Sequence, residues 1–322
     1  AWRRRLNVPL RAVVKCDGYG WGYEALVWAL EPEAQAFCVA DFDELTAVRR
    51  FTSKPVVLLG SVPAEALAEV LDCGGLPTIS TMDELAVVRE WAASSARTPR
   101  IRVGLTQGAG WTGCTLEQLQ SLAPLLADSG VEVEYWTHMT DMDIVEAQIG
   151  AFDRGLDLLR SFGVRVVAID TSSTYPAAKY GARGAAARIG VGLFGAAASE
   201  VPGVRCAIFV DAPVVTRVRH EAGTRVGYGG TMLAMSEVVL TARAGYGDGV
   251  PKTLANGDDI MSVGMQYLTA RGDRVSEQAR SVRLLDRSTD LDTFARRCNR
   301  LAHEVVTAFG TYARANRAQE EV

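Results

Sequence analysis

Over residues 1–200, short runs of apolar and β-branched residues alternate with longer stretches in which apolar residues recur every three or four positions. This alternation predicts strands that are each followed by a helix, which is typical of a parallel sheet. Because the unit repeats eight times, we expect a closed (β/α)8 TIM-type barrel. The expected strands are Ala12–Lys15, Ala36–Ala40, Val56–Gly60, Pro77–Ser80, Arg100–Leu105, Glu132–His138, Arg165–Asp170 and Arg188–Phe194.

Three of the expected helices begin with a recognisable start signal. In each, a short polar residue is followed three positions later by Glu or Gln, as in a capping box. The pairs are Asp41 with Glu44, Thr81 with Glu84, and Thr115 with Gln118.

From residue 201 onward the pattern changes to β-rich segments separated by Gly- and Asp-containing turns such as Gly245–Gly249. The expected strands here are Ala207–Val210, Pro213–Val218 and Ser236–Ala242. Helical spacing returns over Leu291–Phe309, with one apolar side formed by Phe294, Cys298, Leu301, Val305 and Val306. We therefore expect a barrel domain over 1–200 and a mostly β domain over 201–322.

Composition and charge narrow the class of protein. The chain has 322 residues, 48% of them hydrophobic, and a net charge of -4, without the basic excess that nucleic-acid binding usually needs. No apolar run approaches the roughly 20 residues that span a membrane, so we expect a cytoplasmic protein without membrane or nucleic-acid partners. The six cysteines and three histidines show no metal-ligand spacing, and no metal site is expected.

In a (β/α)8 barrel the active site lies at the carboxyl ends of the strands. There the sequence places Lys15, His138, Ser172 with Ser173, and Arg188 followed by Gly190–Gly192. Small residues and glycines after the last two strands are typical of a phosphate site built from backbone N–H groups. Lys15 ends an apolar strand, and apolar surroundings favour the neutral amine that reacts with an aldehyde. Alternatively, Lys15 is a strand-end lysine whose head reaches solvent.

Several motifs in order resemble one known family. Residues 12–22 read AVVKCDGYGWG, 137–139 read THM, 187–195 read ARIGVGLFG, and 245–252 read GYGDGVPK. These resemble the AVVKADAYGHG, THF, VRxGxxxYG and GYADGYPR segments of the fold-type III pyridoxal-phosphate racemases typified by alanine racemase. The resemblance extends over most of the chain and implies a pyridoxal 5'-phosphate cofactor and an amino-acid substrate.

The resemblance also implies roles for individual residues. Lys15 would hold the cofactor and act as one acid/base, and Tyr246 of the partner subunit in a homodimer would be the other. His138 would contact that tyrosine, and Arg188 would contact both His138 and the pyridine nitrogen. An arginine at that nitrogen favours racemisation over decarboxylation, because it leaves the ring a weaker electron sink.

The remaining implied contacts concern the phosphate and the substrate. The phosphate would be bound by Tyr19, Ser173 and the backbone amides of Gly190 and Val191. The Met265 amide would meet the substrate carboxylate. Structural interpretations remain open for several of these residues: a turn aromatic for Tyr246, a hydrogen-bonded histidine for His138, and a strand-end ion pair for Arg188.

One segment departs from the family pattern. Where the family reads DTGMGRLG, residues 106–113 read TQGAGWTG, so Trp111 replaces the arginine that touches the substrate carboxylate. The family's carbamylated lysine, which holds that arginine, is replaced by Val103 or Gly104. We expect a racemase whose substrate differs from alanine or is anchored differently, with Trp111 in the substrate pocket or, alternatively, in the core. Two other functions stay open: aldolase or transaldolase chemistry on a β-hydroxy amino acid, and non-catalytic cofactor binding.

Overall fold

The computed structural model describes residues 1–108, 112–139, 142–228, 230–255 and 259–320, with side chains through residue 314. The chain forms two compact units. The first comprises Ala1–Gly18, Tyr23–Gly192 and Ser199–Pro202, and the second Tyr19–Gly22, Leu193–Ala198 and Gly203–Val322. None of the described helices is both long and apolar enough to span a bilayer.

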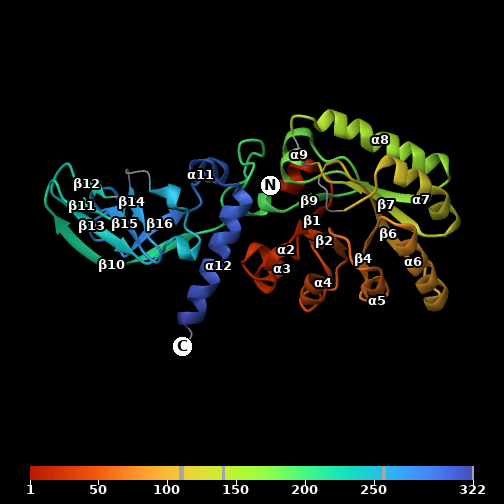
Figure 1. Cartoon of the computed structure of the whole chain (residues 1–322), viewed down its shortest axis with the longest axis horizontal. Coiled ribbons are helices and arrows are strands. Elements are labelled where there is room, and N and C mark those ends of the chain that lie inside the picture. Colours follow the sequence, from red (N-terminus) through yellow and green to blue (C-terminus); the bar gives the residue numbers. More distant parts are fainter. Residues whose placement is uncertain (109–111, 140–141, 229, 256–258, 321–322) are drawn as a thin grey trace. The chain divides into compact units, whose positions relative to one another are not determined.

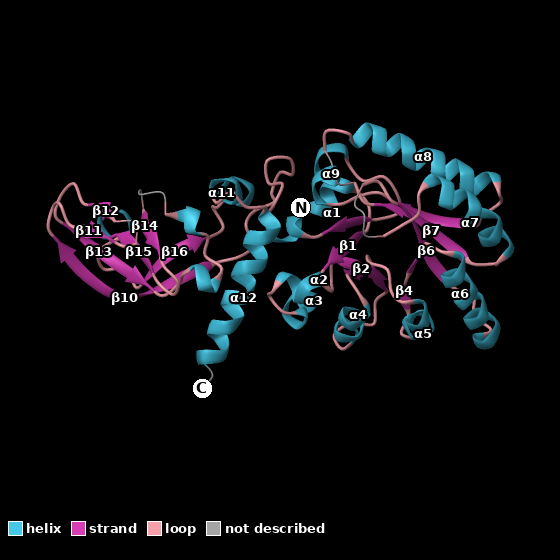
Figure 2. Ribbon diagram, in the orientation of Figure 1, coloured by secondary structure: helices cyan, strands magenta, loops and turns pink. Residues whose placement is uncertain are grey.

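The first unit is a ring of parallel strands with helices on its outer side (Figures 1 and 2). Its strands are β1 (Leu10–Val13), β2 (Ala34–Val39), β3 (Val56–Leu58), β4 (Gly75–Leu76), β5 (Thr78–Ile79), β6 (Arg100–Leu105), β7 (Glu132–Thr137), β8 (Val166–Asp170) and β9 (Ala187–Ile189). Its helices are α1 (Trp2–Leu6), α2 (Lys15–Tyr19, which runs into the second unit), α3 (Tyr23–Leu30), α4 (Phe42–Arg49), α5 (Leu67–Asp72), α6 (Met82–Ser95), α7 (Leu116–Asp128), α8 (Val145–Ser161) and α9 (Thr174–Tyr180). A 3-10 turn, η1 (Ala64–Ala66), precedes α5.

These strands occupy the eight positions expected of the barrel. Pairing runs in the order β4-β3-β2-β1-β9 and β5-β6-β7-β8, and only Pro77 separates β4 from β5. Backbone bonds from Ala185 N–H to the Ile169 carbonyl (3.0 Å) and from Arg188 N–H to the Ser172 carbonyl (3.1 Å) link β8 to β9. The predicted barrel is confirmed.

Six of the expected strands end earlier than predicted, and two of these bear on the site. Strand β1 stops at Val13, so Lys15 begins the following turn instead of ending the strand. Strand β9 stops at Ile189, and Val191–Phe194 form a 3-10 turn, η2. The reason lies at Gly192, whose carbonyl accepts a hydrogen bond from the Trp2 indole (2.8 Å) and where a Cβ would come within 2.5 Å of that ring.

The helix starts are confirmed. Thr81 and Thr115 form complete capping boxes with Glu84 and Gln118. The Asp41 side chain accepts a hydrogen bond from the Glu44 N–H (3.0 Å). The Glu44 carboxylate accepts from the Ala40 N–H (2.7 Å) instead of returning to the cap residue itself.

The second unit is built on an antiparallel sheet in the order β14-β15-β13-β10-β16. Its strands are β10 (Val210–His220), β11 (Arg225–Val226), β12 (Thr231–Met232), β13 (Glu237–Ala242), β14 (Ile260–Val263), β15 (Leu268–Arg271) and β16 (Ser281–Leu285). Its helices are η3 (Tyr246–Asp248), η4 (Lys252–Leu254), α10 (Gly272–Val275), α11 (Leu291–Arg297) and α12 (Ala302–Glu320). The predicted β domain is confirmed, although the strand expected over Ala207–Val210 begins only at Val210.

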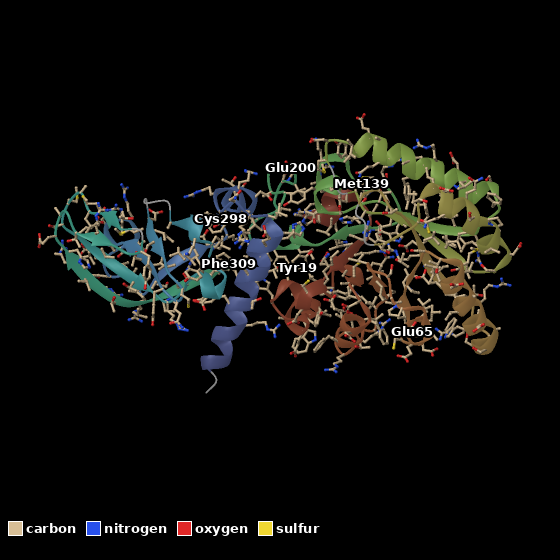
Figure 3. The ribbon with its side chains drawn as sticks, viewed as in Figure 1. Tyr19, Glu65, Met139, Glu200, Cys298 and Phe309 are labelled. Carbon is tan, nitrogen blue, oxygen red and sulfur yellow. The ribbon has the colours of Figure 1, made fainter. Side chains whose placement is uncertain are left out.

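The C-terminal helical segment is two helices, not one. Helices α11 and α12 pack through Phe294 and Phe309, whose ring centroids are 6.3 Å apart (Figure 3). The expectation that Leu301 shares their apolar side is wrong, because Leu301 lies in the break between the helices and its side chain is 66% exposed.

Candidate active site

Lys15 stands at the carboxyl end of β1 and is followed by a turn of the opposite hand to an ordinary helix. Cys16, Asp17, Gly18 and Tyr19 all have φ between 51° and 63°. Left-handed backbone costs roughly 1–2 kcal/mol per non-glycine residue, and Gly18 is the only glycine of the four. A run of such residues next to one half-buried lysine marks a site where the fold fixes the direction of a side chain.

Hydrogen bonds within the first unit hold this left-handed turn. Gly18 N–H donates to the Val14 carbonyl (2.8 Å), and Cys16 N–H donates to the Glu44 carboxylate (2.6 Å). The Asp17 carboxylate accepts from the Tyr23 N–H (3.1 Å) at the start of α3. Glu44 of α4 thus accepts hydrogen bonds from the residue after β2 and from the turn that follows Lys15. These bonds fix the position of Lys15 at the barrel edge.

His138 follows β7, and the residue before it is hydrogen-bonded to residues of β6 and β9. The Thr137 hydroxyl donates to the Leu105 carbonyl of β6 (2.8 Å), and the Thr137 carbonyl accepts from Arg188 Nη2 (2.7 Å). The structure therefore brings Arg188 to the backbone of the segment that carries His138. Met139, the next residue, is buried (Figure 3).

Arg188 is 2% exposed and forms an ion pair, as predicted by the alternative in which it has a structural role. Its Nε lies 2.8 Å from Asp170 Oδ2, and its guanidinium carbon lies 4.9 Å from the centroid of the Trp136 ring. Asp170 was not among the predicted site residues. Because Asp170 ends β8, at the same barrel edge as the other candidates, its place at a strand end could have identified it.

Arg188 belongs to a buried charge cluster inside the barrel, made of Arg11, Arg102, Glu134, Asp170 and Arg188. Burial raises the pKa of Glu134, but the charge of Arg102 and the hydrogen bonds from Arg11 outweigh that effect and hold the pKa at about 2. Burial lowers the pKa of Arg102 to about 10, against the attraction of both carboxylates. The cluster contains three guanidinium groups and two carboxyl groups.

Ser173 directly precedes α9, and the residue after it, Thr174, is hydrogen-bonded to two backbone amides. Ser173 is half-buried and its side chain makes no cap hydrogen bond to that helix. The hydroxyl of the next residue, Thr174, accepts from the Gly190 N–H (3.2 Å) and the Gly192 N–H (3.3 Å). Thr174 was not predicted, although a hydroxyl directly after Ser173 was a visible signal. The predicted amides of Gly190 and Val191 thus lie in a segment that Thr174 orders.

Gly104 and Trp136 face one another across β6 and β7. A Cβ at Gly104 would lie 2.9 Å from Trp136 Nε1, so Trp136 occupies the space that any side chain at this position would need. Trp136 is 1% exposed, and its Nε1 has no hydrogen-bond partner among the described residues. Trp111, predicted to lie in the substrate pocket, falls outside the described residues.

In the second unit, Tyr246 and Met265 lie on bonded segments. Tyr246 N–H donates to the Gly264 carbonyl and Gly247 N–H donates to the Met265 carbonyl, both at 2.8 Å. Tyr246 is 40% exposed and Met265 is 60% exposed. The Lys252 ammonium lies 4.5 Å from the centroid of the Tyr246 ring. The distance is within the range of a cation–π contact.

Tyr19, predicted to bind phosphate, belongs to the second unit and is 5% exposed (Figure 3). Its ring lies 5.3 Å from that of Phe194 and 6.3 Å from that of His303, centroid to centroid. The ring is therefore fixed by aromatic neighbours. No group of three His, Cys, Asp or Glu side chains that could hold a metal occurs within the described part of either unit.

Comparison with known proteins gives a consistent match over both units. Residues 1–198 match the family model for the N-terminal domain of alanine racemase, and residues 207–317 match that for its C-terminal domain. An alanine racemase of Marinobacter nauticus is 29% identical over 266 residues, covering 76% of this chain and 71% of its own. A catabolic alanine racemase of Rhizobium johnstonii is 27% identical over 335 residues, covering 94% and 87%.

Solved structures share the fold. Alanine racemase from D-cycloserine-producing Streptomyces lavendulae superposes with a TM-score of 0.82 at 21% identity, over 96% of this chain and 90% of its own. The Bartonella henselae alanine racemase, solved with covalently bound pyridoxal phosphate, gives 0.80 at 18% identity, over 96% and 92%. Since the family model for the first domain alone matches more than half of the residues, the chain belongs to the alanine racemase family.

Proposed function

We propose that this protein is a pyridoxal-phosphate-dependent amino-acid racemase that moves the Cα proton between Lys15 and Tyr246 of the partner subunit in a homodimer. Family membership over both domains supports the reaction class. The observation that carries the proposal is that Lys15, His138, Ser173 and the Arg188–Asp170 pair all belong to the carboxyl ends of bonded strands in one barrel.

The groups present suit this cofactor. Lys15 supplies an amine at the barrel edge. Ser173 and Thr174 supply hydroxyls that suit a phosphate dianion, and the Thr174 hydroxyl orders the Gly190–Gly192 segment by accepting from two of its amides. Tyr19 and Val191 remain proposed phosphate ligands. Arg188 presents a guanidinium, which cannot be deprotonated and would therefore donate to an unprotonated ring nitrogen of the bound cofactor.

Each residue has a stated task in the reaction. When bound, pyridoxal phosphate draws electrons from the substrate Cα and so makes its proton removable. Lys15 takes or gives that proton on one face, and Tyr246 does so on the other. The Lys252 ammonium lies over the Tyr246 ring and helps to position it. Arg188, fixed by Asp170 and by the Thr137 carbonyl, holds its place beside His138.

We further propose that the substrate is not bound as alanine racemases bind alanine. At Gly104, one of the two positions that replace the family's lysine, there is no space for a longer side chain, because Trp136 Nε1 would lie 2.9 Å from a Cβ there. In the family, that lysine holds the arginine that touches the substrate carboxylate. In this chain both residues are replaced, the arginine by Trp111. The Met265 backbone remains the proposed contact for the substrate carboxylate, and Trp111 supplies a large apolar surface.

A panel of L- and D-amino acids, analysed by chiral chromatography in deuterium oxide, tests this function. The expected result is interconversion of one enantiomeric pair with Cα deuterium incorporation, abolished in Lys15→Ala. Cleavage of a β-hydroxy amino acid to an aldehyde would instead establish the aldolase alternative. Absence of any turnover, with the cofactor bound, would establish the non-catalytic alternative.

Subunit complementation tests the second base. Lys15→Ala and Tyr246→Phe homodimers are each expected to be inactive. Refolding an equal mixture gives heterodimers with one intact site, so about a quarter of the wild-type activity should return if the two bases come from different subunits. If they come from the same subunit, no intact site forms and no activity returns.

A further inference from the structure

A cavity of about 330 Å³ opens in the first unit at the amino ends of the barrel strands, the end opposite to Lys15. Its polar wall includes Arg11 on β1, Arg100 at the start of β6, and Arg97 on the loop before it. Its apolar wall includes Leu71, Leu76 and Trp91. A volume of this size is at the lower end of the range for small-molecule sites.

The cavity carries an excess of positive charge. None of the described residues that line it is acidic. Apart from Asp72, which accepts a hydrogen bond from the Trp91 indole, the nearest carboxylates are those of the buried charge cluster. There Glu134 is shared by Arg11, Arg100 and Arg102, and Asp170 is shared by Arg11, Arg102 and Arg188. Two carboxylates of the cluster are therefore shared among four arginines, and Arg97 is a fifth arginine near the cavity.

The most deeply placed arginine in the wall retains an unused donor. Arg11 is 7% exposed and donates to Glu134 through both terminal nitrogens, one at 2.8 Å. Its Nε has no hydrogen-bond partner among the described residues. This Nε is closed to solvent, so Arg11 contributes the positive charge of its guanidinium to the cavity wall.

The outer arginines are positioned as a clamp. The Arg97 guanidinium carbon lies 5.0 Å from the centroid of the Trp91 ring, and the Trp91 indole donates to Asp72 (2.9 Å), which fixes the ring. Arg100 lies 3.6 Å from Glu134 and remains 46% exposed, so part of its donor set faces outward. Planar guanidinium groups bind carboxylate and phosphate through paired N–H groups.

We propose that this cavity binds a small organic anion. Its carboxylate or phosphate group is held by Arg11, Arg97 and Arg100, and its apolar part lies against Trp91 and Leu76. The site is separate from the racemase centre, because the two lie at opposite ends of the same strands. The proposal does not depend on the identity of the racemase substrate.

Isothermal titration calorimetry on the cofactor-loaded protein, at fixed ionic strength, tests the proposal with three probes: phenyl phosphate, benzoate and inorganic phosphate. Saturable binding of phenyl phosphate or benzoate is expected, weakened at least about tenfold in the Arg97→Gln/Arg100→Gln double variant. Both side chains are exposed, so the variant should fold. Arg154→Gln, which removes an exposed charge from α8, is the matched control and should bind as wild type.

The arms of the titration separate the possible results. Binding of phenyl phosphate alone assigns a phosphate ligand, and binding of benzoate alone assigns a carboxylate. Tighter binding of phenyl phosphate than of inorganic phosphate supports the apolar contact with Trp91. The proposal is overturned if none of the probes binds saturably, or if the double variant binds them as tightly as the wild type does.

Discussion

Arg188 and Asp170 form a buried ion pair, with 2.8 Å between Nε and Oδ2, at the carboxyl end of the barrel. The same carboxylate lies 3.3 Å from Arg102 and 3.5 Å from Arg11, so one acid compensates three guanidinium groups. Arg188 is thereby held from one side by Asp170 and from the other by the Thr137 carbonyl. Its direction is set by the protein before any ligand arrives.

Asp170→Asn should therefore destabilise the protein strongly. Breaking a buried pair by removing one partner costs about 3–5 kcal/mol, because the remaining charge stays buried. The control is Asp153→Asn, since Asp153 pairs with Arg183 at 3.1 Å on the surface and its loss should cost less than about 1 kcal/mol. Urea unfolding measures both. Equal losses in the two variants would show that Asp170 does not compensate the cluster.

Gly104→Ala should destabilise the protein through contact with Trp136. The new Cβ would lie 2.9 Å from the indole nitrogen and 3.4 Å from the Gly113 Cα, and overpacking of this kind costs roughly 1–3 kcal/mol. Gly150→Ala in α8 is the matched control: its nearest contact is 3.7 Å away, and alanine is the better helix former.

A second substitution makes the cause of that loss measurable. Trp136→Phe removes the part of the ring that faces Gly104, so Gly104→Ala should cost less in that background than in the wild type. Chemical denaturation of the four proteins in the cycle gives the coupling energy. A coupling of zero would mean that Trp136 does not fill the space in question.

Gly18→Ala tests the left-handed turn after Lys15. Alanine at φ 63° is strained, and its Cβ would also lie 3.2 Å from the Leu26 side chain. Gly163→Ala, at φ 79° with no atom within 4 Å of its Cβ, isolates the backbone cost of roughly 1–2 kcal/mol. The Gly18 variant should lose more stability than this control and should bind pyridoxal phosphate more weakly, measured by absorbance. Equal losses and unchanged cofactor affinity would contradict a role for the turn in directing Lys15.

The barrel could be predicted from the sequence because each strand is a local apolar run with a nearby helix start, such as Thr81 with Glu84. The ion pairs could not, since Arg11 and Glu134 are 123 residues apart and only strand order brings them together. Lys15 was found by its motif, whereas the left-handed turn after it has only Gly18 as a local signal. Asp170 and Thr174 were missed because their roles depend on Arg188, which lies on the next strand, and on Gly190, which directly follows it.

Acid should destabilise this protein through Glu134 in particular. The pKa of this carboxyl is about 2 in the folded protein, against 4.5 for an ordinary glutamate. The unfolded chain therefore binds more protons than the native state between these values. The stabilisation, on the order of 3 kcal/mol, is complete above about pH 4.5 and is lost as the pH falls towards 2.

Urea unfolding between pH 2.5 and 7 checks this with two variants of the same strand. Glu134→Gln should be less stable than the wild type at neutral pH, and the gap should close as the pH falls through 4.5. Glu132→Gln, whose ion pair with Arg165 is at the surface, should keep the acid sensitivity of the wild type. Should Glu134→Gln not fold, the carboxyl carbon of Glu134 can be followed by 13C NMR in the wild type. A midpoint near 4.5 there would mean that Arg102 and Arg11 do not hold the carboxylate charged.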